Sequence, residues 1–409
     1  MRWEKITHSN DNEEVTAMQP LEGIDVLDFT QSIAGPICTQ SLTALGANVV
    51  KIEPPDGDAF RPLIDGAMFA SCNRGKRSLS LDLKSDEGRA LAQELAAEAD
   101  VVVESFRPGV MERYDLDYES VSETNDDVVY CSVTGFGQDG PYEDYPAYDP
   151  IAQAMSGLLS VTGPADGKPA RVGTSAIDYT TGLTAAMLVM GGLLGRHSGG
   201  SEHIDVSLFE VATTWMGYRV AEYTATDQVP TRSGDTIDGI APYGIFEAGD
   251  GDPFYLATAS TKLYHRLCRT LEREDLLEDE RFETLSSRSE HRETLRAELE
   301  EAFAEYDRRE LVERLVSGGI PAGPVQSIDE LVEEDPHAES RDFFVETYNQ
   351  HLEEPCRTTR LPFRFEDGPV DDLESPPRQG EHSRAVLEEW GYDDETIEAL
   401  LADGVIVES

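Results

Sequence analysis

The chain has 409 residues, of which 39% are hydrophobic, so it is long enough for two or three domains and can bury a core. Its 81 acidic residues outnumber the 33 basic ones, and the formal net charge is −48. This charge, without a basic stripe, disfavours nucleic acid and anionic membrane surfaces as partners.

The basic residues are mostly arginines, because lysine is nearly absent. The lysines are Lys5, Lys51, Lys76, Lys84, Lys168 and Lys262. Acid spread along the whole chain, together with depleted lysine, predicts a surface adapted to high salt, where screening reduces self-repulsion.

The cysteines (Cys38, Cys72, Cys131, Cys268 and Cys356) are widely spaced and form no CxxC or CxxH pair. We therefore expect no metal site and a reduced, cytoplasmic setting, with Cys38 and Cys131 as small core residues. The polar N-terminus lacks the apolar stretch of a signal peptide. The longest apolar run is interpreted as too short and too rich in glycine to cross a bilayer.

The N-terminal half shows apolar runs that alternate with helical segments, after a polar extension at residues 1–18. Strands are predicted at 24–29, 47–52, 78–83, 100–104 and 128–133. A turn at 30–36 leads into a helix that ends near residue 45, and an amphipathic helix with a start that resembles a capping box covers 85–99. The alternation predicts an α/β fold with a largely parallel, doubly wound sheet.

The second half changes character. A hydrophobic helix, a strand at 202–207 and another helix are predicted between 180 and 215. A smaller unit follows at about 225–330, with a strand at 254–258 and a helix at 289–306. The remaining residues include an apolar segment at 361–365 and a final helical stretch.

Asp178 is the most informative residue, because the chain after it runs from Tyr179 to Gly195 without one charge. Such a carboxylate either caps a helix or takes part in chemistry. Common signatures are missing: there is no GxGxxG, no Walker A motif and no HExxH. Residues 173–177 begin like the nucleophile elbow of serine hydrolases but lack its second glycine.

Eight segments in order resemble the family III CoA transferases, which include formyl-CoA transferase and carnitine CoA-transferase. They span nearly the whole chain from residue 21 and include LEGIDVLDFTQSIAGP, SFRPGVMERYDLDY, YPAYDPIAQAMSGLLSVTG and VGTSAIDYTTGLTAA. The segments lie at 21–58, 73–89, 100–118, 145–163, 172–186, 203–210, 318–331 and 380–391.

The resemblance implies that Asp178 is a covalent nucleophile. Its carboxylate would attack an acyl-CoA thioester to form a mixed anhydride, and the CoA thiolate would then convert this to an aspartyl-CoA thioester before CoA passes to the acceptor acid. The alternative is a helix N-cap, and the two are compatible, because N–H groups at a helix start would keep the carboxylate ionised.

The resemblance also implies where coenzyme A binds, as a substrate and not as a resident cofactor. Lys84, Arg107 and Arg113 match positions near bound CoA, and the alternative for each is solvated surface charge. The other matching residues are Leu81 and Phe106 on the adenine side, Ile33 and Ala34 in the first turn, and Tyr148 and Asp149 near the pantetheine and thioester. For Phe106 the alternative is a plain core residue.

Two loops bear on specificity. The glycine-rich segment 135–140 resembles a family loop that approaches the active site, or is an ordinary turn. The glycine run that gates formyl-CoA transferase is replaced here by residues 235–244, which puts an oxalate or formate specificity in doubt. Ile33 stands where that enzyme has a glutamine, so a polar contact is lost there.

Three other functions compete with CoA transfer from a donor such as succinyl-CoA to a small acid such as mesaconate. α-Methylacyl-CoA racemase shares the fold but has a His-Asp pair where this chain has Tyr148-Asp149, and tyrosine is a poor base at neutral pH. Intramolecular CoA transfer stays open. A catalytically inactive CoA-binding scaffold is disfavoured by the retained Asp178.

The resemblance further implies an interlocked, ring-threaded homodimer in which monomers are inactive. We expect a large Rossmann-like domain at 19–224, a small α/β domain at 225–330 and a C-terminal segment at 331–409 that returns to the large domain.

Overall fold

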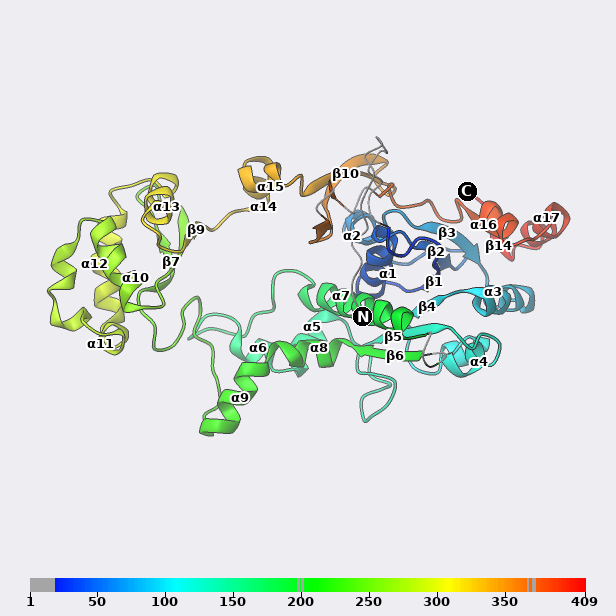
Figure 1. Cartoon of the computed structure of the whole chain (residues 1–409), viewed down its shortest axis with the longest axis horizontal. Coiled ribbons are helices and arrows are strands. Elements are labelled where there is room, and N and C mark those ends of the chain that lie inside the picture. Colours follow the sequence, from blue (N-terminus) through cyan, green and yellow to red (C-terminus); the bar gives the residue numbers. More distant parts are fainter. Residues whose placement is uncertain (1–18, 197–198, 200–201, 366–367, 370–372) are drawn as a thin grey trace, which may run out of the picture. The chain divides into compact units, whose positions relative to one another are not determined.

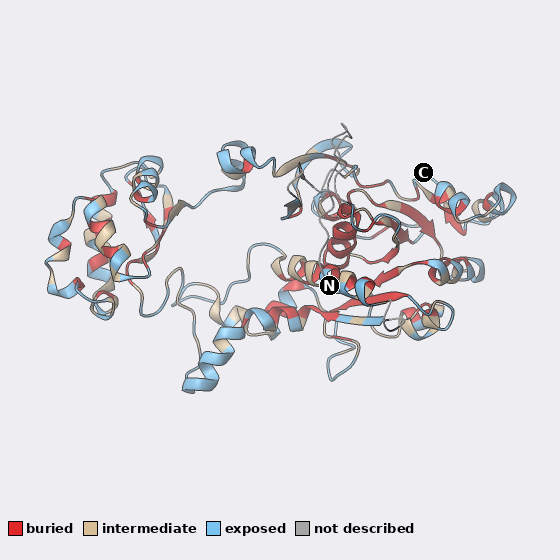
Figure 2. Cartoon of the chain, viewed as in Figure 1, coloured by how far each residue is buried: buried red, intermediate tan, exposed pale blue. Residues whose placement is uncertain are grey.

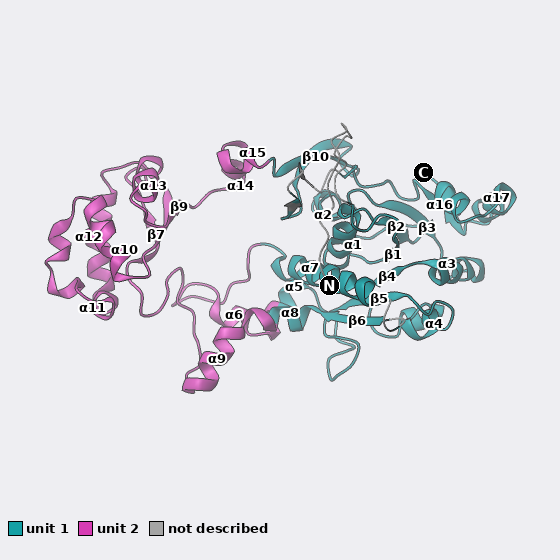
Figure 3. Ribbon diagram, in the orientation of Figure 1, with its two compact units in different colours: residues 1–152, 174–212, 342–409 teal, residues 153–173, 213–341 magenta. Residues whose placement is uncertain are grey.

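The computed structural model describes residues 19–196, 199, 202–365, 368–369 and 373–409, so the predicted extension at 1–18 lies outside the described residues. The chain forms two compact units (Figures 1 and 3). The first comprises residues 1–152, 174–212 and 342–409, and the second comprises 153–173 and 213–341. The second unit is thus longer than the small domain expected at 225–330 and is built from two segments.

The first unit contains a seven-stranded sheet in the order β14-β3-β2-β1-β4-β5-β6. Strands β1 to β6 are parallel, and β14 is antiparallel to β3. The predicted α/β class with a parallel sheet is confirmed. The strands are β1 Asp25–Phe29, β2 Asn48–Glu53, β3 Arg77–Leu81, β4 Val101–Glu104, β5 Val129–Thr134, β6 Glu202–Ser207 and β14 Ile406–Val407.

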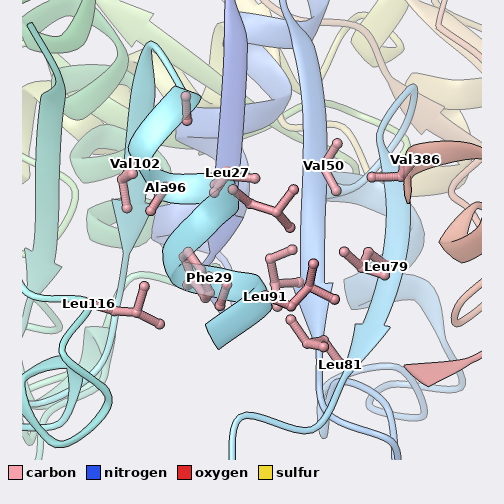
Figure 4. Close-up of a cluster of buried hydrophobic side chains, with 14 of the residues drawn as sticks. Leu27, Phe29, Val50, Leu79, Leu81, Leu91, Ala96, Val102, Leu116 and Val386 are labelled. Carbon is pink, nitrogen blue, oxygen red and sulfur yellow. The ribbon is translucent and has the colours of Figure 1, made fainter. Parts of the chain in front are cut away.

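Apolar side chains on one face of this sheet form a core with four helices (Figure 4). Leu27 of β1 lies beside Val50 of β2 and Val102 of β4, and all three are almost fully buried. In Figure 2 the red of buried residues follows strands β1 to β5, whereas the edge strand β6 is largely exposed. The helices on this face are α3 Asp86–Glu98, α4 Tyr118–Ser122, α16 Ser383–Glu389 and α17 Asp394–Ala402. Ser85 caps α3 by accepting a hydrogen bond from the backbone N–H of Gly88.

Two closely packed helices, α1 (Ala34–Ala44) and α7 (Ala176–Gly195), contact the sheet strands from their other side. Gly182 permits this approach, since a Cβ there would collide with the carbonyl oxygen of Ala34 and lie 2.8 Å from the Cβ of Ile37. Helix α7 has 20 residues and is long and apolar enough to cross a membrane, so the expectation that this run is too short was wrong. In the structure it packs against α1, β5 and β6.

The C-terminal residues return to the first unit through α16, α17 and the pairing of β14 with β3. Two helices, α5 Asp149–Met155 and α8 Leu208–Trp215, begin in this unit and run on into the second. The other elements of this unit are α2 Ala67–Cys72, a 3-10 turn Met111–Tyr114, and the antiparallel pairs β10 Phe344–Asn349 with β11 Glu354–Thr359 and β12 Arg364–Phe365 with β13 Gly368–Pro369.

The second unit has its own core around the antiparallel sheet β7-β8-β9. The helix predicted at 289–306 is divided at His291 into α11 and α12. Its elements are α6 Leu158–Val161, α9 Gly217–Thr226, β7 Tyr243–Glu247, β8 Pro253–Ala257, α10 Thr261–Thr270, 3-10 turns Glu274–Leu277 and Glu280–Phe282, α11 Leu285–Glu290, α12 Arg292–Phe303, α13 Arg308–Ser317, β9 Ala322–Pro324, α14 Ile328–Glu333 and α15 Pro336–Ser340.

Candidate active site

A cavity of about 210 Å³ lies at the carboxyl ends of the parallel strands in the first unit. Strand order reverses between β1 and β4, and ligands of doubly wound sheets bind at this switch point. The lining residues are Gln31, Ser32, Ala34, Gly35, Phe60, Ser105, Phe106, Arg107, Pro108, Val133, Thr134, Gly135, Glu143, Tyr145, Pro146, Ala147, Tyr148, Asp178 and Leu208.

The segments after β1 and β4 are joined directly. The backbone N–H of Gln31 donates to the hydroxyl of Ser105 at 2.9 Å. The backbone N–H of Phe106 donates to the carboxylate of Glu104 at 2.7 Å. The Gln31–Ser105 bond fixes two walls of the cavity against each other, although the walls lie more than seventy residues apart in sequence, and the Phe106–Glu104 bond holds the turn after β4.

A buried ionic frame lies beneath the turn after β1. The Lys76 ammonium contacts the Asp28 carboxylate at 3.0 Å, and both side chains are fully buried. Asp28 also accepts hydrogen bonds from Thr30 and from Thr39 of α1. Burial acts to raise the pKa of Asp28, but Lys76 and Lys51 hold it below its ordinary value. The charged pair therefore ties β1, its turn and α1 together.

Lys51 extends this frame from β2. Its ammonium donates to the backbone carbonyl of Thr30 at 2.6 Å and contacts the Asp58 carboxylate at 3.0 Å. Burial acts to lower the pKa of Lys51, but the acids around it raise the pKa above its ordinary value, so the residue stays charged. Two of the few lysines in the chain are thus interior residues that shape the turn beside the cavity.

Asp178 is the third residue of α7, where Ser175 is the N-cap position, so interpreting it as an N-cap was wrong. The side chain is 8% exposed and lines the cavity. Burial raises the pKa of Asp178 to about 7, with a second contribution from the charge of Asp149 and a smaller opposing one from a hydrogen bond with Ser175. At pH 7 this carboxyl is therefore only about half ionised, so helix N–H groups do not hold its pKa low as expected.

Asp149 occupies the place at the helix start that a capping side chain would take. Its carboxylate accepts hydrogen bonds from the backbone N–H groups of Ile177 at 2.8 Å and Asp178 at 3.3 Å. Asp149 is 1% exposed and lies behind the cavity wall. A direct contact with pantetheine stays a prediction that this geometry does not favour.

The structure brings some of the predicted CoA contacts to the cavity and leaves others elsewhere. Ala34, Phe106, Arg107 and Tyr148 line it, and Tyr148 is 62% exposed. The others lie outside its lining: Ile33 is buried at the start of α1, Leu81 is in the core of Figure 4, and Lys84 and Arg113 are exposed on the surface.

Several lining residues were missed by the sequence interpretation. Gln31, Ser105 and Phe60 come from three loops, and Glu143 and Tyr145 precede α5. The position of Ser105 directly after a buried strand was a usable signal, because carboxyl ends of parallel strands carry binding residues. Gly135, at the start of the glycine-rich segment, also lines the cavity, which agrees with the expected approach of this loop to the site.

Known proteins place this chain in a family. CoA-transferase family III matches residues 21–383. A succinate–glutarate CoA-transferase of Agrobacterium fabrum is 34% identical over 93% of this chain and 96% of its own length. The chain belongs to CoA-transferase family III. A succinyl-CoA:mesaconate CoA-transferase of Haloarcula marismortui is also 34% identical, over 92% of this chain and 98% of its own.

A solved structure agrees with the fold of this family III CoA-transferase. The crystal structure of a CAIB/BAIF family protein from Brucella suis has a TM-score of 0.81 and 35% identity, and the match covers 91% of this chain and 99% of that one. The resemblance noted in the sequence is therefore confirmed, and the protein is a CoA-transferase. Enzymes of this class use CoA thioesters as substrates.

Proposed function

We propose that this enzyme moves CoA from succinyl-CoA to a small dicarboxylic acid such as mesaconate, with Asp178 as the covalent nucleophile. The observation that carries the proposal is the position of the Asp178 carboxyl in the lining of the switch-point cavity. The names of the relatives, which act on glutarate and mesaconate, support the substrate class. The salt-adapted composition fits the Haloarcula relative and a halophilic, cytoplasmic setting.

The proposed reaction has four acyl transfers, each of which forms one bond at a carbonyl carbon and breaks another. An Asp178 oxygen attacks the thioester carbon of the donor, the C–S bond breaks, and a mixed anhydride and CoA thiolate form. The thiolate attacks the Asp178 carbonyl carbon, which releases the donor acid and leaves an aspartyl-CoA thioester. The acceptor carboxylate attacks the same carbon and expels CoA thiolate. The thiolate then attacks the acceptor acyl carbon, which gives the new thioester and restores the carboxylate.

The surroundings of Asp178 suit these intermediates. An anhydride hydrolyses if water reaches it, and the Asp178 side chain is largely buried. Arg107 supplies positive charge to the same cavity, where it can face the phosphates of CoA. Phe106 presents an aromatic side chain there, as the adenine contact would require.

Racemisation is less well supported by this geometry. Tyr148 lines the cavity where a racemase would have its histidine base. A tyrosine hydroxyl has an ordinary pKa near 10 and accepts a proton poorly at neutral pH. Proton exchange at the α-carbon would therefore lack one of its two bases.

The test is to incubate the enzyme with succinyl-CoA, quench in acid and search the Asp178 peptide for a CoA adduct by mass spectrometry. We expect the adduct and succinyl-CoA:mesaconate turnover in wild type, and neither in Asp178→Asn. The control Asp126→Asn makes the same chemical change at an exposed site of the same unit and should behave like wild type.

Two isotope experiments separate the alternatives. Labelled free mesaconate should enter the thioester pool, and failure of the label to enter while CoA moves would show intramolecular transfer. Deuterium incorporation from solvent at the α-carbon without CoA exchange would refute the transferase proposal.

The interlocked homodimer is part of the same proposal. Large apolar side chains stay exposed within each unit, and such patches mark protein contacts. In the first unit Met187 and Leu194 of α7 are 58% and 82% exposed, and in the second Tyr218 and Val220 of α9 are 70% and 51% exposed. Light scattering coupled to gel filtration in high salt should give a dimer, and a stable, active monomer would contradict it.

A further inference from the structure

The start of α7 is capped by a residue from another element. Ser175 occupies the N-cap position, and no capping hydrogen bond of its side chain is found among the described residues. An N-cap side chain normally accepts a hydrogen bond from the backbone N–H of the second or third helical residue. Here both of these N–H groups, those of Ile177 and Asp178, donate to Asp149 instead. Because the third residue is Asp178, the cap acts on the backbone of the proposed nucleophile itself.

We propose that Asp149 is a positioning residue that fixes the first turn of α7 and thereby aims the Asp178 carboxyl into the cavity. This inference rests on the proposed function, since it concerns the residue that would carry the acyl group. Asp149 is buried behind the wall and does not line the cavity, so it acts through Asp178 and not on CoA.

The same carboxylate has an electrostatic consequence. A negative charge beside a buried acid disfavours its ionised form, and Asp149 contributes to the raised pKa of Asp178. Asp149 therefore improves geometry while it reduces the ionised fraction of the nucleophile. Other charged or titratable groups lie on the elements around this site. Those that line the cavity are Arg107, Glu143, Tyr145 and Tyr148. Those on or beside the elements that pack against α7, or on α7 itself, are Cys38, Cys72, Glu104, Tyr130, Cys131, Tyr179, Glu202, His203 and Asp205.

Two substitutions separate position from charge. Asn at this place keeps an acceptor oxygen and caps helices about as well as Asp, whereas Ala removes the acceptor. For Asp149→Asn we expect near-wild-type kcat above pH 8, and the acid limb of the kcat profile shifted down by about one pH unit. For Asp149→Ala we expect kcat to fall by about 100-fold above pH 8, where Asp178 is ionised in both proteins, because a small displacement of a reacting group has an effect of this size.

The KM for succinyl-CoA distinguishes positioning from binding. It should stay within about twofold in both variants, since a group that holds the nucleophile gives no uniform substrate binding. A large rise in KM with unchanged kcat would instead show that Asp149 contacts CoA and would overturn the inference. Full activity of a folded Asp149→Ala would also overturn it. Equal pH profiles for wild type and Asp149→Asn would refute the electrostatic consequence alone.

Circular dichroism and thermal unfolding of each variant show whether the fold is intact. If Asp149→Ala does not fold, Asp149→Ser, which is shorter and keeps a polar side chain, replaces it in the kcat comparison. The adduct experiment keeps this failure separate from failure of the proposed function. An Asp178-CoA adduct in wild type together with full activity of folded Asp149→Ala refutes the positioning role alone, whereas the lack of any adduct in active wild type refutes the nucleophile.

Discussion

Replacing Asp178 by Asn should remove activity and yet stabilise the protein at neutral and alkaline pH. The folded-state pKa of about 7 lies above the ordinary value of 3.8. Between these values the folded state holds a proton that the unfolded state has lost, so the free energy of unfolding of wild type falls as pH rises. At about 1.4 kcal/mol per pH unit, the stabilisation by Asp178→Asn should grow by about 3 kcal/mol between pH 5 and pH 8.

Urea unfolding of wild type and Asp178→Asn at pH 5, 6, 7 and 8, in constant high salt, measures this difference. Constant salt keeps the screening of surface acids the same at each pH, so their contribution cancels between the variants. Asp126→Asn changes an exposed acid and should show a difference that stays nearly constant over the series. If the difference in free energy of unfolding between Asp178→Asn and wild type also stays constant with pH, the raised pKa of Asp178 is refuted.

Three further changes have expected effects. Gly182→Ala forces α7 away from the carbonyl oxygen of Ala34 and should reduce the free energy of unfolding by about 1–3 kcal/mol. It should also lower kcat, because Asp178 lies one helical turn away. Lys76→Met leaves Asp28 charged and unpaired and should reduce stability by about 3–5 kcal/mol in urea unfolding. Arg107→Ala should raise the KM for succinyl-CoA about tenfold or more, through loss of a charged hydrogen bond of about 1.5–3 kcal/mol.

Each change has a matched control in the chain. Gly191→Ala lies in the same helix with open space around it and should stabilise by up to about 1 kcal/mol. Lys84→Met removes an exposed lysine, and Arg113→Ala an exposed arginine outside the cavity lining. Equal changes in the free energy of unfolding for Gly182→Ala and Gly191→Ala would contradict the close helix contact. A loss of stability below about 1 kcal/mol for Lys76→Met would contradict the buried ion pair. A larger rise in KM for Arg113→Ala than for Arg107→Ala would contradict the CoA contact of Arg107.

The elements of the sheet were predictable because strands buried on both faces are continuous apolar runs in the sequence. Strands at 24–29 and 100–104 were expected and correspond to β1 and β4. Their adjacency was not predictable, since the order of strands depends on which crossovers pack together. The cavity follows from that adjacency, and its Gln31–Ser105 bond could not be inferred from either segment alone.

The nucleophile candidate could be located from sequence, but its electrostatics could not. The uncharged segment after Asp178 indicated burial, which the structure shows. The sequence pattern pointed to helix N–H groups around Asp178, whereas the fold gives those groups to Asp149. Residues matched by motif also separated in space: Phe106 and Arg107 reach the cavity, while Leu81 belongs to the core.

The ionic frame of Lys51, Lys76 and Asp28 lies where dissolved ions cannot reach it. In dilute buffer the repulsion among the surface carboxylates grows, because the Debye length rises to about 30 Å at 0.01 M salt. The attraction within the frame stays nearly the same. Desalting should therefore loosen the outer surface first and leave the turn after β1 in place, so that activity lost on brief dialysis returns when salt is restored.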